Sequence, residues 1–457
     1  MRKKVLIVLL ITIVMGGTQA LAQKPSFSLD SLRSLAIAGN KNLRMGDMRV
    51  TAAGDERRAA FTKYLPRVNA TGAYLHSSKE ISLLSDEHKA TLPALDDKLG
   101  GLGSKLVEDL HTDTRNMGTV AVMLTQPIYM GGKIAAYNRI TRYAEAIVRV
   151  QNDRTLQDVI VEVDETFWRI AALKARRELA EGFLRLVERL DSDVQQMIDA
   201  GIATKADGLS VKVKVNEARV AIIQVDNALD MSKMKLCQIC GLDISTDFDI
   251  DEDEFDMSSM AVRQSVESDV HTAFANRPEL KALDLSTNIY KEKVKLARAE
   301  FLPTVALTGG WLASNPSVFN SFERKMKGMW NVGVAVNIPI VTFGERIYKE
   351  RAARSNACIA RLELEETREK VELQVNQSHR KLTEAEQRLA TAIKGKDEAD
   401  ENMRYATLGM KEGVIPVSNV LDAQTAWLSA HSQCVDAEID LRLAHLYLDR
   451  ATGKIGY

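Results

Sequence analysis

Residues 119–128 read TVAVMLTQPI, and residues 331–340 read NVGVAVNIPI. Both stretches alternate apolar residues with small or polar ones before they reach a proline, and they align without a gap at an offset of 212 residues. An alternation with a period of two is typical of a β-strand that has one apolar face. Two such strands at matching places far apart in one chain indicate an internal repeat.

The repeat extends along most of the chain. Upstream of the strands, YLP at residues 64–66 matches FLP at residues 301–303 at an offset of 237. The first copy therefore has 25 extra residues, which lie between about Ser77 and Asn116. At the offset of 212, further positions carry the same residue in both copies: Gly132 and Gly344, Gly201 and Gly413, Leu209 and Leu421, Ala218 and Ala430, and Gly241 and Gly453.

The first 22 residues have the pattern of a secretory signal peptide. Three basic residues precede the apolar run from Val5 to Met15, and residues 20–22 form a small-x-small cleavage site. The alternative is an N-terminal membrane anchor, but the run is shorter than the roughly 20 residues that a spanning helix needs. The predicted organisation is a signal peptide at 1–22, a first repeat at 23–245, an acidic linker at 246–263 and a second repeat at 264–457.

Long helices dominate the expected fold. Charged residues make up 27% of the chain and aromatic residues 5%, and there are only 9 prolines, a composition close to that of long-helix proteins. Within each copy the predicted order is helix, strand, loop, strand, very long helix, turn, helix. The very long helices are expected from about Lys133 to Ala200 and from Glu345 to Lys411, where apolar residues recur in steps of three and four. Each would be roughly 100 Å long, and the opening helix would be capped by Asp30 or Ser31 and stopped by Pro66.

Four predicted strands decide between a periplasmic rod and a membrane channel. Each is apolar on one side only, and lengths of about 10 residues with aromatic residues at the ends are typical of strands that cross the outer membrane. A soluble sandwich is the alternative. Since a sheet in lipid must close and four strands are too few for a barrel, the membrane interpretation requires several copies of the chain. The strands are expected at 66–76, 117–128, 303–312 and 330–340, and the lipid-facing side chains are Val68, Tyr74, Val120, Val122, Val305, Trp311, Trp330 and Val334.

No catalytic, metal or cofactor site is expected. The 7 histidines form no short ligand pair, and no Ser, His, Asp grouping has the context of a nucleophile. The acidic run between Asp247 and Asp256 lacks the glycine and the spacing of a calcium loop, so a solvated linker is the interpretation. Cys237 and Cys240 lie late in a helical pattern, outside the strand-turn-helix context of a redox motif, so cysteines that pack between helices are expected, with disulfides as the alternative. Lysine and arginine number 61 against 62 acidic residues, so no basic excess points to nucleic acid.

The turn before the last predicted helix carries the most specific match to a known family. Residues 408–423 read LGMKEGVIPVSNVLDA, and residues 200–207 of the first copy read AGIATKAD. With the leader and the two helix-strand-strand-helix-helix copies, the whole mature chain resembles the TolC-like outer-membrane factors.

The resemblance implies a mainly α fold with a small β part. The resemblance further implies that a homotrimer forms a twelve-stranded β-barrel in the outer membrane of a Gram-negative bacterium, together with a long periplasmic α-helical barrel. It also implies passive export of small toxic compounds or polypeptides, with a periplasmic adaptor protein and an inner-membrane pump as partners. A periplasmic coiled-coil scaffold or adaptor protein without a barrel is the alternative.

The resemblance also implies site residues at the two turns. Several members of the family carry Tyr, Arg and Asp where this chain has Met410, Ile415 and Asn419, and only Asp422 keeps an acid. These four residues are expected at a periplasmic gate, where the Asp422 carboxylates of a trimer would form a ring. The alternative for Asp422 is a charge favoured at a helix N-terminus. Adaptor docking is expected at Gly201, Asp207, Gly409 and Gly413.

Overall fold

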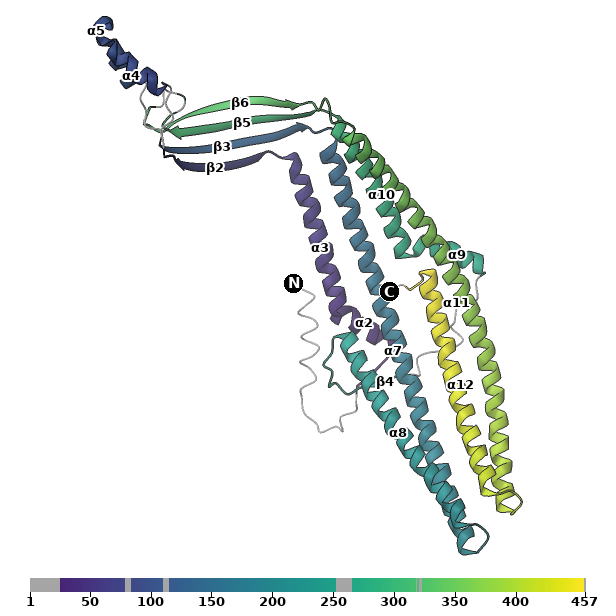
Figure 1. The fold of residues 1–457 in the computed structure, drawn as a ribbon. Helices are drawn as coiled ribbons and strands as arrows, with labels where there is room; N and C mark the ends of the chain where they lie inside the picture. The colour runs from purple at the N-terminus through teal and green to yellow at the C-terminus, as the bar shows by residue number, and fades with distance from the viewer. Residues whose placement is uncertain are drawn as a thin grey trace, which may run out of the picture. The chain divides into compact units, whose positions relative to one another are not determined.

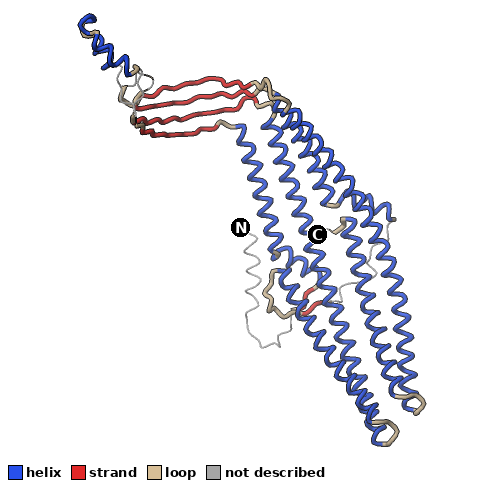
Figure 2. Tube along the Cα trace, in the orientation of Figure 1, coloured by secondary structure: helices blue, strands red, loops and turns tan. Residues whose placement is uncertain are grey.

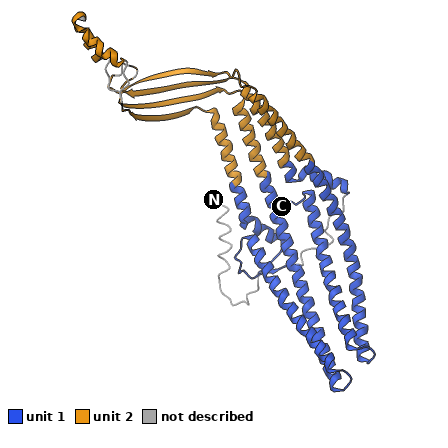
Figure 3. Cartoon of the chain, viewed as in Figure 1, with its two compact units in different colours: residues 1–48, 150–281, 366–457 blue, residues 49–149, 282–365 orange. Residues whose placement is uncertain are grey.

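The computed structural model describes residues 25–78, 84–109, 115–251, 265–317, 319 and 323–455. The chain forms two compact units, coloured in Figure 3, and each is described by itself. The helical unit contains the residues up to 48 together with 150–281 and 366–457, and the sheet unit contains 49–149 and 282–365. The predicted signal peptide lies outside the described residues.

Both copies of the repeat build the same long helices (Figure 1). Helices α7 (Lys133–Asp199) and α11 (Glu345–Lys411) have 67 residues each, and helices α8 (Lys205–Cys240) and α12 (Val417–Thr452) have 36 residues each. The bounds of each pair are related by the offset of 212 residues, so the two copies are in register without a gap. Figure 2 shows that helices make up most of the described chain. No helix among the described residues combines the length and the apolar composition that a membrane span needs.

Each copy opens with a helix that is broken once, a feature that the sequence did not predict. Helices α2 (Leu29–Gly39) and α3 (Lys41–Phe61) meet at Asn40, and helices α9 (Val266–Asn276) and α10 (Pro278–Arg298) meet at Arg277. At Asn40 the side chain Nδ2 donates to the carbonyl of Ile239 at 2.9 Å, and Oδ1 accepts from the amide of Asn42 at 2.8 Å. The side chain thus ends one helix and caps the next.

The predicted cap of the opening helix is wrong. The N-cap is Ser28, whose Oγ accepts the amide of Ser31 at 3.4 Å, rather than Asp30 or Ser31 themselves. Ser265 caps α9 at the equivalent position in the second copy.

The sheet unit holds a four-stranded antiparallel sheet in the order β2-β3-β5-β6. Its strands are β2 (Arg67–His76), β3 (Asn116–Tyr129), β5 (Thr304–Asn315) and β6 (Lys327–Asn337). The last strand differs most from the prediction of 330–340, because it begins earlier and ends at Asn337. The last pair of the ladder is Thr304 with Asn337. Pro303 directly precedes Thr304, and Pro339 lies two residues after Asn337. A proline has no amide to donate, so the ladder cannot continue at these positions.

The segment inserted in the first copy contains short helices where only a loop was predicted. These are α4 (Asp86–Ala94), α5 (Asp96–Leu99) and α6 (Leu102–Asp109). The Asp96 carboxylate accepts the amides of Gly103 and Ser104 at 2.6 and 3.0 Å, and so joins α5 to α6.

The acidic linker is only partly solvated, which corrects its interpretation. Strand β4 (Asp249–Ile250) pairs in parallel with β1 (Ser26–Phe27) near the start of the described chain. Phe248 and Ile250 are buried, while acidic residues alternate with them. Phe248 and Ile250 pack into the core of the helical unit. Residues 252–264 of the predicted linker lie outside the described part of the chain.

Apolar clusters hold the helical unit together, and the smallest among the described residues packs α11 against α12 around Leu382 and Leu441. One lies between α2, α7 and α8 around Leu32, Phe167 and Leu236. It also contains Cys237 and Cys240, whose thiols are free. Burial raises the pKa of Cys240 to about 12, which keeps the thiol protonated and fits a packing role. The second cluster joins α7, α8, α11 and α12 close to their turns.

Candidate functional site

The register of the sheet brings the predicted apolar side chains to one face. Tyr74 pairs with Gly118, Val122 with Trp311, and Trp311 with Trp330, and directly paired residues point to the same side of a sheet. The members of this face are Val68, Ala70, Gly72, Tyr74, Val120, Val122, Leu124, Val305, Leu307, Gly309, Trp311, Trp330, Val332, Val334 and Val336.

This apolar face is open to its surroundings in the single chain. Trp330 is 76% exposed and Tyr74 is 72% exposed, while Val305 is half-buried. A shallow groove of about 420 Å³ runs across the face between Val68 and Trp330. The opposite face carries polar and small residues such as Thr71 and Asn331. A face of this size that is exposed and apolar marks a surface for lipid or for another protein.

Both edges of the sheet lack a neighbour among the described residues. Strand β2 is paired on one side only, with β3, and strand β6 is paired on one side only, with β5. Such edges present a row of unpaired amides and carbonyls to a further strand. Because the four strands alternate in direction, an edge β6 is antiparallel to the β2 of a second copy placed beside it.

The turns at the ends of the long helices are alike in the two copies. Gly201 and Gly413 have φ values of 75° and 70°, are exposed, and have open space where a side chain would stand. Their amides bond Ile198 and Met410 at 2.9 and 3.0 Å, closing the helix ends. The left-handed backbone explains why both copies have glycine here.

The two other predicted docking residues have structural roles. Asp207 forms a capping box with Thr204, in which the Asp207 amide donates to Thr204 Oγ1 at 3.2 Å and the Thr204 amide donates to the carboxylate at 2.9 Å. These bonds from the side chain and backbone of Thr204 lower the pKa of Asp207. Gly409 is half-buried, and a Cβ there would stand 2.5 Å from Ile415. Gly201 and Gly413 are exposed and Asp207 and Gly409 are half-buried, and adaptor docking at these four residues stays a prediction.

The predicted gate residues do not lie on one surface. Met410 is 1% exposed in the single chain and packs in the cluster that joins the four long helices, whereas its place at a gate stays a prediction. The phase of α11 turns this position into the core. Ile415 is half-buried, whereas Asn419 and Asp422 are exposed on the first turns of α12. Asn419 and Asp422 therefore remain candidates for a gate.

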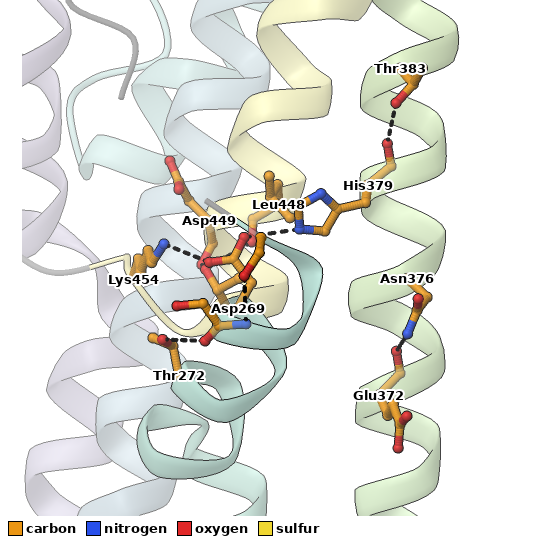
Figure 4. Close-up of polar contacts among 12 residues, drawn as sticks. Asp269, Thr272, Glu372, Asn376, His379, Thr383, Leu448, Asp449 and Lys454 are labelled. Carbon is orange, nitrogen blue, oxygen red and sulfur yellow. Dashed lines mark hydrogen bonds and ion pairs between the residues drawn. The ribbon is translucent and has the colours of Figure 1, made fainter. Parts of the chain in front are cut away.

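A buried polar cluster in the helical unit was not predicted (Figure 4). The carboxylate of Asp269 on α9 bonds His379 Nε2 on α11 at 2.9 Å and Lys454 Nζ, after α12, at 2.8 Å. Asp269 is 2% exposed and His379 is 6% exposed. Desolvation raises the pKa of the nearby Asp449, and the charge of Asp269 acts in the same direction.

Comparing the two copies would have revealed this cluster. The first copy has Leu32, Phe167 and Leu242 at the positions of Asp269, His379 and Lys454, and all three belong to its apolar core. The signal in the sequence is that the second copy has an acidic or basic residue at positions where the first copy has an apolar one.

A second pair of contacts differs between the copies in the same way. Asp400 accepts bonds from Trp427 Nε1 at 2.6 Å and from His431 Nε2 at 2.8 Å. At the equivalent positions of Asp400 and His431 the first copy has Glu188 and Arg219, which bond at 2.9 Å. The contact between the two long helices of the second copy therefore contains a histidine where the first copy has an arginine.

No group of three His, Cys, Asp or Glu side chains among the described residues is arranged to hold a metal ion. A tandem-repeat chain with long helical hairpins and a four-stranded sheet that is apolar on one face has the build of an outer-membrane export channel.

Residues 32–242 and 270–454 match the model of the outer membrane efflux protein family, and the chain belongs to this family. The protein is an outer-membrane channel of the efflux and secretion type, and the resemblance to TolC-like factors is confirmed. The family consists of passive channels rather than enzymes.

Relatives and solved structures agree with this membership. The chain is 24% identical to CyaE of Bordetella pertussis over 440 residues, covering 94% of this chain and 86% of CyaE. It is 23% identical to the outer membrane efflux protein BepC of Brucella suis over 351 residues, covering 75% of this chain and 74% of BepC. The fold is similar to that of the outer-membrane channel OprN, with a TM-score of 0.76, 15% identity and 96% of each chain covered.

Proposed function

We propose that three copies of the chain close a twelve-stranded β-barrel in the outer membrane, and that their long helices enclose a periplasmic tunnel through which substrates leave the cell. The observation that carries this proposal is the sheet itself, which has one apolar face and two edges without a neighbour among the described residues. In a hydrocarbon environment both edges must be paired, because no water is available to their backbone groups. Strand β6 of one copy and strand β2 of the next can supply that pairing.

The helices support assembly of several copies. Exposed apolar residues recur along α8 and α11 on sides that the single chain leaves open, and such residues are typical of surfaces buried against another subunit. On α8 they are Leu209, Val213, Val220, Ile223, Met231 and Met234, and on α11 within the helical unit they are Leu373, Ile393, Tyr405 and Leu408.

We assign the energy and the selection of cargo to partners. A passive duct needs an inner-membrane pump, and the exposed turns at Gly201 and Gly413 are proposed to meet a periplasmic adaptor protein. The cargo is proposed to be small toxic compounds or polypeptides, since relatives are named both as an efflux protein, BepC, and as an alkaline protease secretion protein, AprF of Pseudomonas aeruginosa.

Disulfide cross-linking between copies tests the barrel. In a cysteine-free background, a cysteine at Thr71 in β2 is combined in turn with a cysteine at Asn331, Gly333 or Ala335 in β6, all on the polar face. One of these pairs should give covalent trimers in outer-membrane fractions, in which the unlinked protein runs as an SDS-resistant, heat-modifiable oligomer. A soluble periplasmic protein without heat-modifiable oligomers would favour the coiled-coil scaffold instead.

A further inference from the structure

A groove in the sheet unit lies where α3 and α7 run toward the strands. Its volume is about 620 Å³, within the range of sites that hold a small ligand. Among the described residues that line it there is no acidic side chain. Its principal lining residues are Arg57, Arg58, Arg139, Arg142, Phe61 and Tyr64.

Some of these arginines are available to an added anion. Arg57 and Arg139 bond the buried carboxylates of Glu145 and Glu292, both at 2.7 Å. Among the described residues Arg58 pairs with Asp55, in an exposed pair that is weak and easily exchanged. The Arg142 guanidinium stands 5.5 Å from the ring centre of Tyr143.

The second copy shows how an arginine at the position of Arg142 is neutralised. There the carboxylate of Glu350 bonds both Arg298 and Arg354 at 2.7 Å. Glu350 is the equivalent of Asn138 at the 212-residue offset, and Arg354 is the equivalent of Arg142. Asn138 is neutral, and its amide donates to the carbonyls of Ala60 and Ile134 at 3.0 and 2.9 Å. The first copy thus keeps the guanidinium but lacks the carboxylate that would bond it.

The groove lies close to the strands along the chain. Strand β2 begins at Arg67, and the short helix Thr62–Tyr64 lies between it and the end of α3 at Phe61. Arg58 therefore lies nine residues before the strand, whereas Tyr64 lies three residues before it. The rings of Phe61 and Tyr64 lie 5.8 Å apart at the groove, and Phe61 is 59% exposed. Exposed aromatic rings close to the end of a membrane strand are typical of the membrane interface.

We propose that this groove binds the phosphate of an anionic phospholipid, with the phosphate in the place that Glu350 takes in the second copy and the acyl chains along the exposed rings. Arginine suits this role because its planar donors match a phosphate oxygen pair. The inference rests on the proposed function, since it requires that the sheet cross the membrane.

Competition between lipids tests the proposal. The purified full-length oligomer is equilibrated with equal amounts of phosphatidylglycerol and phosphatidylcholine, and bound lipids are counted by native mass spectrometry. The wild type should prefer phosphatidylglycerol by roughly thirtyfold, as expected for two basic side chains near a lipid phosphate at about 1 kcal/mol each. Asn138→Glu, which supplies the missing carboxylate, and Arg58→Gln/Arg142→Gln should both abolish the preference.

Matched controls separate this site from a general charge effect. Arg351→Gln/Arg361→Gln removes the same charge from the second copy and should leave the preference unchanged. Loss of preference in this control, or displacement of phosphatidylglycerol by excess inorganic phosphate, would overturn the proposal in favour of general attraction or a soluble anion. A heat-modifiable oligomer without lipid preference would refute the lipid site alone, whereas absence of the oligomer would refute the proposed function.

Discussion

The Nε2 atom of His379 lies 2.9 Å from Oδ2 of Asp269, at a place where the first copy has Phe167 and Leu32. The first copy therefore has apolar packing at the place where the second copy has a buried ionic cluster. Removing one member of such a cluster leaves the remaining charges buried without a partner, which costs more than replacing the whole cluster by apolar residues.

The variant Asp269→Leu should lower the stability of the helical unit by about 3 kcal/mol, because Lys454 and His379 then face an apolar side chain. The triple variant Asp269→Leu/His379→Phe/Lys454→Leu reproduces the apolar set of the first copy and should recover most of the loss. The thermal midpoint of the purified oligomer, followed by circular dichroism, measures both. A triple variant no more stable than the single one would show that this packing does not fit the second copy.

The contact between α11 and α12 should weaken in acid. Burial opposes the ionised form of Asp400, but the bonds from His431 and Trp427 outweigh it and lower the pKa of Asp400. A lowered pKa means that the stabilisation is complete above the ordinary pKa of an aspartate, about 4, and is lost as the pH falls through the lowered value. Emission from Trp427 between neutral and acidic pH, isolated by subtracting a Trp427→Phe variant, should change in this range. If the emission of Trp427 changed over the same pH range in the variant Asp400→Asn, the assignment to Asp400 would be contradicted.

A charge on the apolar face of the sheet should prevent assembly. Val334 is exposed on this face, and an arginine or lysine near the bilayer midplane costs about 2 to 4 kcal/mol. Val334→Arg should therefore reduce the heat-modifiable oligomer in isolated membranes, whereas Asn331→Arg, on the opposite face, should not. Equal yields of the two variants would argue against a membrane barrel in this register.

A bulky residue at the turn of the second copy should block adaptor docking. Gly413 has a φ of 70°, so any side chain there adds backbone strain, on the order of 1 kcal/mol. Gly413→Ala carries this strain without bulk and serves as the matched control for Gly413→Trp. Co-purification of the adaptor with the outer-membrane oligomer should be lost only in Gly413→Trp. Loss in both variants would assign the effect to the turn conformation.

The exposed Asp422 should influence ion flow through the proposed trimer. Three carboxylates close together attract cations. Planar-bilayer recordings of Asp422→Ala should show a weaker cation preference than the wild type. Unchanged conductance and selectivity would leave Asp422 as a charge that favours the helix N-terminus.

Patterns with a fixed period could be predicted from the sequence. The alternation in the strands placed Val68, Val122 and Val334 on the same side, and the ladder register confirms that they share a face. The steps of three and four likewise located the long helices, because periodicity depends only on local geometry. The strand end at Asn337 was missed because its position depends on where the partner strand begins.

Features that depend on several segments at once could not be predicted. The helix break at Asn40 needs the carbonyl of Ile239, which is distant in the sequence. The position of Met410 in the family turn suggested a gate, but its burial depends on the packing of four helices. The Asp269 cluster required three segments to meet, and only a comparison of the copies marks it in the sequence.

The even number of strands in each copy has a topological consequence. A copy enters the sheet from a helix and returns to a helix at the same end, since β2 and β3 run in opposite directions, as do β5 and β6. Duplicating such a unit keeps every helix of the new copy on the side of the parent. A unit with an odd number of strands would instead have placed the second set of helices at the opposite end of the sheet, so the duplication preserved the direction in which the helices leave the strands.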